Sequence, residues 1–181
     1  MRKIIISSQV SMDMVIDNPQ NFVFDYVNEE FMDYARTQLF ESDALIMGRL
    51  TYEGFAEAWS SREGTDEFAD RMNSLTKYVA SRTLKEPLKW NANLIKGDVV
   101  KEVKKLKEQD GKNILQYGSG ELTHTLLEHG LIDEFRLMVF PVAMGAGQRL
   151  FENIQKVPMK LLETKTFSTG VAILHYQPVN K

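Results

Sequence analysis

The chain has 181 residues, a length that fits one compact domain, and we expect a single domain over residues 1–181. Its formal net charge is −3, so it has no basic field of the kind that holds nucleic acid, and its apolar runs are too short to predict a signal peptide or a membrane span. Cysteine is absent, which excludes disulfides, thiolate catalysis and cysteine metal sites. We expect a cytoplasmic protein whose chemistry depends on other side chains or a cofactor.

Strand and helix patterns alternate along most of the chain, which favours an α/β fold. Short apolar runs predict strands at residues 3–9, 43–48 and 77–81, and more weakly at 93–97. Amphipathic helices are expected between them: one after an Asn28 cap, with Phe31, Ala35 and Leu39 on one face, and one after Thr65, with Phe68 and Met72 on one face.

The second half of the chain begins with another amphipathic helix and ends with strands. Asp98 is expected to cap a helix whose apolar stripe is Val99, Val103 and Leu106, with Gly111 as its stop. A strand, a glycine turn and a further helix follow. Strands are then predicted at 134–142, 160–167 and 171–178. The last two are joined by a short turn, so we expect an antiparallel hairpin that closes a mostly parallel sheet.

Several familiar sites are excluded by spacing. Ser119 is not a nucleophile-elbow serine, because Tyr117 stands where that motif needs glycine. His124 and His129 lie five apart, on different sides of a helix, and His175 is on a distant strand, so we expect no metal site. The glycines of the turn do not form a full dinucleotide fingerprint, and no P-loop is present.

The turn at Gly118, Ser119, Gly120 and Glu121 lies between a strand and a helix. Such a turn directs unpaired backbone N–H groups and the positive end of a helix dipole at whatever lies above it, a geometry that favours a phosphate. A tight connection without a ligand is at least as good an interpretation of this turn taken alone.

Two further strand ends carry groups that can bind phosphate. The strand at 43–48 is followed by Arg49, which can fork onto a phosphate, and by Thr51, which can add a hydroxyl. The strand at 77–81 ends at Ser81 and Arg82. Carboxyl ends of parallel strands share one edge of a sheet, where α/β folds bind ligands. The alternative for the first group is a helix start with Thr51 as its cap and Arg49 in solvent.

At this point five segments together resemble a known family. They are IISSQVSMD, MGRLTYE, KYVASRTL, ILQYGSGELTHTLLEHGLIDEF and FPVAMGAGQRLF, which span nearly the whole chain. The chain resembles the dihydrofolate-reductase-like fold, in the branch of the C-terminal reductase domain of bacterial riboflavin biosynthesis (the RibD C-terminal domain) and its stand-alone relatives. The resemblance implies a three-layer α/β fold with a mostly parallel sheet, and an NADPH-dependent reductase that is often a homodimer joined through its C-terminal strands.

The resemblance also implies a role for each matching residue. Hydride would pass from NADPH to an unsaturated carbon or imine of a small heterocyclic or sugar-derived substrate. The expected cofactor-binding residues are Gly48, Arg49, Thr51, Ser81 and Arg82, at the 2′-phosphate and neighbouring groups, and Gly118, Ser119, Gly120 and Glu121, at the pyrophosphate and nicotinamide side. Gly145 and Gly147 would shape a loop near the mouth of the site, or simply form a bulge.

The substrate side is also assigned by resemblance. Asp13 is expected to face the substrate, and Asp33 lies near where folate-reducing relatives keep a substrate-binding carboxylate; a solvent-facing Asp33 is the alternative. Phe24, Tyr52 and Trp59 are expected to form walls of a pocket for a planar substrate, and core packing is the alternative for each of them.

Two departures from the family pattern keep other functions open. Met14 stands where the family usually has glycine, and Tyr117 stands where riboflavin-pathway reductases commonly have an acid. A non-catalytic nucleotide-binding or dimerisation module of the same fold is therefore an alternative, and a flavin-binding oxidoreductase is another.

Overall fold

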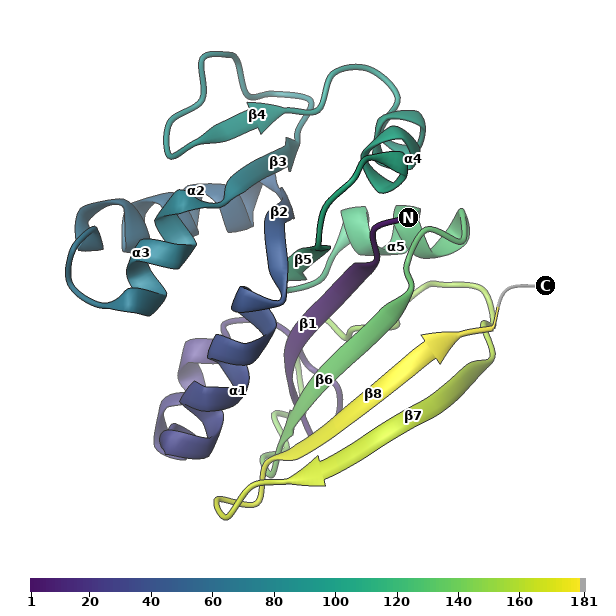
Figure 1. Cartoon of the computed structure of the whole chain (residues 1–181). Helices are drawn as coiled ribbons and strands as arrows, with labels where there is room; N and C mark the ends of the chain where they lie inside the picture. The colour runs from purple at the N-terminus through teal and green to yellow at the C-terminus, as the bar shows by residue number, and fades with distance from the viewer. Residues whose placement is uncertain (180–181) are drawn as a thin grey trace.

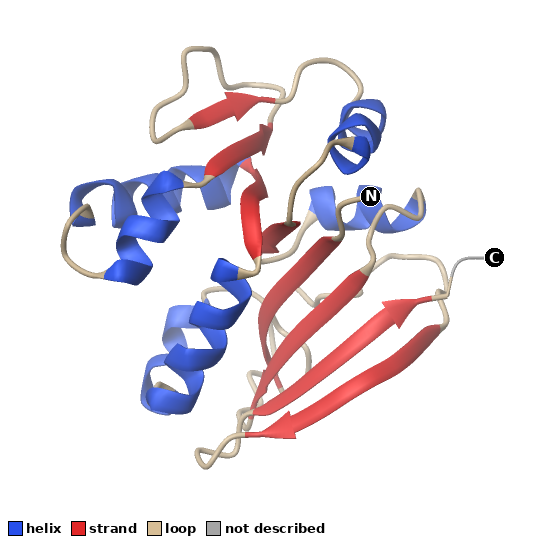
Figure 2. Ribbon diagram, viewed as in Figure 1, coloured by secondary structure: helices blue, strands red, loops and turns tan. Residues whose placement is uncertain are grey.

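The structure is a computed structural model that describes residues 1–179, so the last two residues of the expected domain lie outside the described part. One sheet of eight strands runs through it, in the order β4-β3-β2-β5-β1-β6-β8-β7 (Figures 1 and 2). The strands are β1 (Ile4–Ser11), β2 (Ser42–Gly48), β3 (Thr76–Ala80), β4 (Ala92–Leu94), β5 (Asn113–Tyr117), β6 (Glu134–Phe140), β7 (Met159–Thr166) and β8 (Ala172–Pro178).

Strands β1 to β6 are parallel, β8 runs in the opposite direction, and β7 at the edge has the direction of the first six. β1 pairs in parallel with both β5 and β6, while β8 is antiparallel to β6 and β7 is antiparallel to β8. The predicted α/β fold with a C-terminal antiparallel hairpin is confirmed. The weak strand prediction at 93–97 corresponds to β4, which is short and lies at the edge of the sheet.

Five α-helices cover the two faces of the sheet. They are α1 (Glu29–Phe40), α2 (Arg49–Trp59), α3 (Glu67–Ser74), α4 (Val99–Glu108) and α5 (Glu121–Glu128), and short 3-10 helices η1 (Pro19–Asn21), η2 (Phe24–Tyr26) and η3 (Ser60–Arg62) lie in the loops. Figure 1 shows α1, α2 and α3 on one side of the sheet and α4 and α5 on the other. None of the helices in residues 1–179 combines the length and apolar character that a membrane span requires.

The apolar faces of these helices explain the layering. Leu39 of α1 and Met72 of α3 pack in one buried cluster with Leu45 of β2. Val103 of α4 packs on the opposite face with other buried residues, including Leu126 of α5. Because β2 is buried on both faces, its centre is a continuous apolar run rather than an alternating one.

Two expected helix caps are present in the structure, and other helix boundaries differ from expectation. The side chains of Asn28 and Asp98 accept the expected backbone N–H bonds, at 3.0 Å and 3.1 Å. The helix expected after Thr65 is α3, and its cap is Asp66, whose carboxylate accepts from Ala69 N at 2.8 Å. The prediction that Gly111 stops α4 was wrong: the helix already ends at Glu108, where the following residue becomes extended.

Candidate functional site

The order of the strands creates a crevice between β2 and β5. These strands are neighbours, but the chain leaves β2 through α2 on one face of the sheet and leaves β5 through α5 on the other face. Connections that diverge in this way open a crevice beyond the carboxyl ends of the strands, and this is where open α/β sheets bind ligands. The fold therefore provides a site at the ends of β2 and β5.

A cleft of about 920 Å³ lies at this position. Its walls come from the ends of β2, β3 and β5 and from the starts of α2, α4 and α5. It brings together eight of the nine predicted cofactor-binding residues: Gly48, Arg49, Thr51, Ser81, Arg82, Ser119, Gly120 and Glu121. The ninth, Gly118, begins the glycine turn but does not line the cleft, and an added Cβ there would be 3.9 Å from Thr51 Oγ1. Segments far apart in the sequence thus form one concave surface.

Three helices begin at this cleft. α2 starts after Gly48 and α5 starts after Gly120, and neither of these glycines offers a side chain to accept the first free N–H groups. α4 starts after Asp98, whose carboxylate accepts from Lys101 N. The Thr51 alternative is excluded, because Thr51 lies inside the first turn of α2 and Gly48 is the cap. Uncapped helix starts with their positive dipole ends favour an anion.

Two arginines supply the positive charge of the cleft. Arg49 is paired with Glu53 one turn further along α2, at 2.8 Å, and Arg82 is paired with Glu121 at 3.3 Å. Both pairs are exposed, and exposed ion pairs are weak because water screens them. The guanidinium groups can therefore exchange these partners for a phosphate at little cost.

Contacts with β1 hold the glycine turn in place. Gly118 N donates to Ser7 O at 3.0 Å, and the hydroxyls of Ser8 and Ser119 are 2.6 Å apart. Gly118 has a φ of 70°, a left-handed conformation that favours glycine. These contacts fix the turn from β1, and on the helix side Gly120 N donates to Thr123 Oγ1 at 3.3 Å.

Asp13, which is expected from the resemblance to face the substrate, has contacts with the loop after β6. Its carboxylate accepts from Ser11 Oγ at 2.6 Å and from the backbone N–H groups of Met144 and Gly145, at 3.0 Å and 2.8 Å. The Ser11 hydroxyl, followed by these two N–H groups, holds the pKa of Asp13 well below its usual range. A carboxylate held in its ionised form is a poor proton donor. These contacts make Asp13 an anchor of the 144–145 loop.

The remaining predicted substrate-side residues lie outside the cleft. Asp33 is exposed on α1, and Phe24 is 72% exposed in η2. Tyr52 is buried, and its hydroxyl bonds the backbone of Lys89, so it ties α2 to a loop. Trp59 packs at a tilt against Phe68 at the other end of α2, about 15 Å along the helix from Arg49. The structure favours core packing for Tyr52 and Trp59.

Several cleft residues were not predicted from the sequence. They are Leu50, Ala80, Thr83, Ile95, Gly97, Asp98, Val99, Val100, Gln116, Leu122, Thr125 and Gln148. The segment 97–100 was identified only as a helix start. Its position at the cleft follows from the sheet order, which no local pattern displays.

Gln148 reaches the cleft because the loop that carries Gly145 and Gly147 folds back on the segment after β1. Val15 and Arg149 form an antiparallel bridge, and Gln148 N donates to Asp17 Oδ2 at 2.7 Å. Gly147 has a φ of 120°, and a Cβ there would lie 2.6 Å from Val15 Cγ1. The predicted loop near the mouth of the site is present, and only glycine fits at 147.

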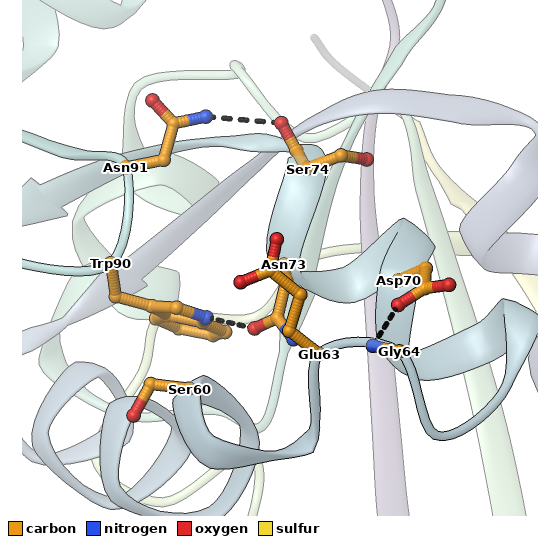
Figure 3. Close-up of a pocket in the computed structure, with 8 residues that line it drawn as sticks. All are labelled: Ser60, Glu63, Gly64, Asp70, Asn73, Ser74, Trp90 and Asn91. Carbon is orange, nitrogen blue, oxygen red and sulfur yellow. Dashed lines mark hydrogen bonds between the residues drawn. The ribbon is translucent and has the colours of Figure 1, made fainter.

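A second cavity, of about 680 Å³, lies between the α2–α3 connection and residues 90–91. Figure 3 shows the Trp90 indole directed at Asn73, and Asn91 at the backbone of Ser74. Asp70 accepts from Gly64 N at 2.6 Å. Most of the polar groups drawn there bond one another. The strand-end cleft, with its free helix starts and cations, is therefore the stronger candidate for a binding site.

Comparison with known proteins agrees with this geometry. A protein of Bacillus subtilis (strain 168), named "Uncharacterized protein YyaP", is 33% identical over 97% of this chain and 94% of its own length. A solved structure from Shewanella sp. PV-4, provisionally described as a riboflavin biosynthesis protein, has a TM-score of 0.77 at 22% identity and covers 98% of this chain and 99% of that one.

A third similar structure is that of a longer protein, of which this chain matches a part. The Thermotoga maritima diaminohydroxyphosphoribosylaminopyrimidine deaminase/5-amino-6-(5-phosphoribosylamino)uracil reductase has a TM-score of 0.69 at 14% identity, with 98% of this chain matching 57% of that one. The family model for the RibD C-terminal domain matches residues 2–173. The chain therefore belongs to the RibD C-terminal domain family.

Proposed function

We propose that this protein is an NADPH-dependent reductase that transfers hydride to a small heterocyclic substrate, such as a ribosylamino-pyrimidine-like compound. The observation that carries the proposal is the cleft at the β2–β5 crevice, where eight residues expected to bind the cofactor meet. The family and the reductase named among the structural neighbours support it. The volume of the cleft is also within the range of small-molecule sites, roughly 300–1,000 Å³.

The groups in the cleft fit a phosphorylated dinucleotide. Arg49 and Arg82 supply two guanidinium forks, and Thr51 and Ser81 supply hydroxyls, which is the donor set that phosphate oxygens require. The starts of α2 and α5 add N–H groups for a pyrophosphate. Arg82 and Ser81 follow β3, and the glycine turn follows β5, so the adenosine end would lie toward β3 and the nicotinamide end toward β5 and β1.

The residues of this chain would bind, orient and enclose the dinucleotide. When bound, the nicotinamide supplies the hydride. The arginines and helix starts would fix the dinucleotide along the strand ends, and the glycine turn would let the backbone approach it closely. The anchor formed by Asp13 would hold the 144–148 loop, and with it Gln148, against the cleft. Fixed geometry of this kind is the protein's main contribution to hydride transfer.

The test is direct binding followed by turnover. Titration calorimetry with NADPH, NADH and flavin mononucleotide is expected to show saturable binding of NADPH in the micromolar range, weaker binding of NADH and none of the flavin. A screen of pyrimidine and pterin substrates that follows loss of reduced-nicotinamide absorbance then tests for reductase activity. If NADPH does not bind, the proposed function is wrong.

A non-catalytic module of the same fold is the second candidate, and two observations favour it. Tyr117 replaces the acid common in riboflavin-pathway reductases, and its hydroxyl is buried without a hydrogen-bond partner in residues 1–179. Asp13, the other expected catalytic group near the site, is engaged by the 144–145 loop. This module would bind NADPH as tightly as the enzyme but would reduce none of the screened substrates.

We also propose that the protein acts in the cytoplasm as a homodimer, with no nucleic-acid or membrane partner. The edge strand β7 supports the dimer, because Leu161 and Leu162 on it are 49% and 46% exposed. Unpaired edge strands with apolar side chains favour association with another chain. Light scattering behind a sizing column measures the mass, which is 20.8 kDa for one chain. A monomer at micromolar concentration would contradict the dimer.

A further inference from the structure

Gln116 is a buried cleft residue to which neither the sequence motifs nor the family comparison assigns a role. It lies on β5 one residue before Tyr117, is 3% exposed, and lines the cleft. Its register partner on β1 is Ile6, which packs in the cluster that contains α5, so the Gln116 side chain is on the α5 face of the sheet. Glutamine is seldom this buried unless its amide is satisfied.

Only half of the Gln116 amide is satisfied. The Nε2 group donates to Thr123 Oγ1 at 2.6 Å and to Gly118 O at 3.3 Å, whereas Oε1 is buried and has no hydrogen-bond partner among the described residues. A backbone carbonyl can only accept, so the contact with Gly118 O fixes which end of the amide carries the N–H groups. The orientation of the side chain is therefore determined, and the free atom is an acceptor.

A buried acceptor without a partner costs free energy, and a ligand that supplies a donor recovers it. Phosphate oxygens are acceptors, so Oε1 repels rather than binds the groups expected at the adjacent glycine turn. The ligand atom that fits is a neutral N–H or O–H. Gln116 lies on β5, which is two strands away from β3 and its Arg82, and next to β1. It is thus at the end of the cleft opposite the arginine-bearing β3 loop.

We infer that Gln116 Oε1 accepts a hydrogen bond from a neutral donor in the nicotinamide half of the bound dinucleotide, and so positions that half. This inference rests on the proposed NADPH function and assigns it a further cofactor-contacting residue. The nicotinamide half offers two kinds of donor, the carboxamide N–H and the ribose hydroxyls. A phosphate-bearing adenosine fragment offers neither at this end of the cleft.

The experiment compares Gln116→Leu with the wild type in calorimetric titrations of NADPH and of adenosine 2′,5′-bisphosphate, which lacks the nicotinamide half. Loss of one hydrogen bond to a buried group is expected to weaken NADPH binding about tenfold. Binding of the bisphosphate should stay the same. Gln38→Leu is the matched control, because Gln38 is 1% exposed and its amide has no partner in the described part of the chain, but it lies on α1, on the opposite face of the sheet; NADPH affinity should not change.

An analogue of NADPH identifies the donor and excludes a purely structural role. In the 3-acetylpyridine analogue a methyl ketone replaces the carboxamide. If the carboxamide is the donor, the wild type prefers NADPH over the analogue and Gln116→Leu loses that preference; if a ribose hydroxyl is the donor, the variant weakens both dinucleotides equally. If Gln116→Leu only disturbs the glycine turn, the bisphosphate weakens as well, and the inference is overturned.

Two other outcomes separate this inference from the function on which it rests. Full NADPH affinity in Gln116→Leu would overturn the role of Gln116 and leave the NADPH proposal intact. Failure of the wild type to bind NADPH or the bisphosphate would overturn the proposed function itself. Thermal unfolding of each variant shows whether the fold is retained before affinities are compared.

Discussion

Arg82 and Glu121 face each other at the cleft, with the guanidinium of Arg82 3.3 Å from the carboxylate of Glu121. Arg82 follows β3 and Glu121 is the first residue of α5, so the pair joins the loop after β3 to the start of α5, at the place where we propose that phosphates bind. The carboxylate competes with those phosphates for Arg82 and stands at a helix start that would otherwise attract them.

Replacement of Glu121 by glutamine is therefore expected to strengthen NADPH binding about two- to five-fold at low salt, and less at high salt, since exposed ion pairs are weak and screened. Calorimetry at two ionic strengths measures the effect. Weaker binding in Glu121→Gln would instead show that the glutamate contacts the cofactor, as the family resemblance implies.

Arg49→Ala is expected to weaken NADPH at least tenfold while changing NADH little, because a hydrogen-bonded guanidinium contributes most where a second charge, the 2′-phosphate, is present. The measurement is the ratio of the two dissociation constants. Arg62→Ala is the matched control: it removes the same charge at the far end of α2, where Arg62 stacks on Trp59 at 4.5 Å. Equal losses for NADPH and NADH in Arg49→Ala would place the 2′-phosphate elsewhere.

Asp13→Asn tests whether the carboxylate is an anchor or a catalytic group. The native carboxylate accepts three hydrogen bonds, and an asparagine amide cannot accept from both Met144 N and Gly145 N in the same way. The variant should melt at a lower temperature and retain turnover. Because the pKa of Asp13 is depressed, its stabilising effect is present above the ordinary pKa of 3.8 and is lost only as the pH falls through the lower folded value. An unchanged melting temperature with abolished turnover would support the catalytic role.

Lys77 also makes the free energy of unfolding depend on pH, but through burial of its charge and not, as for Asp13, through hydrogen bonds that stabilise the charged form. Its ammonium is buried, donates to Asn73 O at 2.7 Å and lies 4.2 Å from the centre of the Trp90 ring, and burial lowers its pKa from 10.5 to about 8. Between these values the unfolded chain binds more protons than the folded chain. The contribution of Lys77 to the free energy of unfolding therefore rises with pH from about 8 to about 10.5, by at most on the order of 3 kcal/mol.

Lys77→Met should lose this rise. Urea unfolding at several pH values within the window measures it as the difference between wild type and variant, which removes the titration of other groups. Lys104→Met, at an exposed position on α4, is the control and should track the wild type. Parallel curves for wild type and Lys77→Met would show that Lys77 stays charged through this window in the folded chain, so that burial does not lower its pKa.

Gly147→Ala is expected to destabilise the protein by roughly 2–4 kcal/mol, because the residue has a φ of 120° and the new methyl group would meet Val15 Cγ1 at 2.6 Å. Val15 is 1% exposed and has no room to move. Gly54→Ala is the matched control. Gly54 lies within α2 with nothing near its Cβ position, so alanine there should stabilise by up to about 1 kcal/mol. Thermal or urea unfolding measures both, and a neutral Gly147→Ala would contradict the packing of the 144–148 loop.

Local patterns in the sequence determined the elements and the groups that we propose to bind phosphate. Apolar runs bounded by polar residues located the strands, and Asn28 and Asp98 marked two helix starts, because these signals depend on neighbours along the chain. The same holds for the groups after the strands: Arg49, Ser81 and the glycine turn were predicted as one site because carboxyl ends of parallel strands share an edge.

The tertiary structure decided what each side chain contacts. Asp13 was expected to face a substrate, but its partners, Met144 and Gly145, are more than 130 residues away, and no local pattern predicts such contacts. Trp59 was expected at the pocket, yet the length of α2 carries it to the other end of the helix. Gln116 looked like one polar residue in an apolar strand. Only the packing of α5 against β5 satisfied its amide N–H groups and left its oxygen without a partner, because burial is a property of the folded chain and not of the residue.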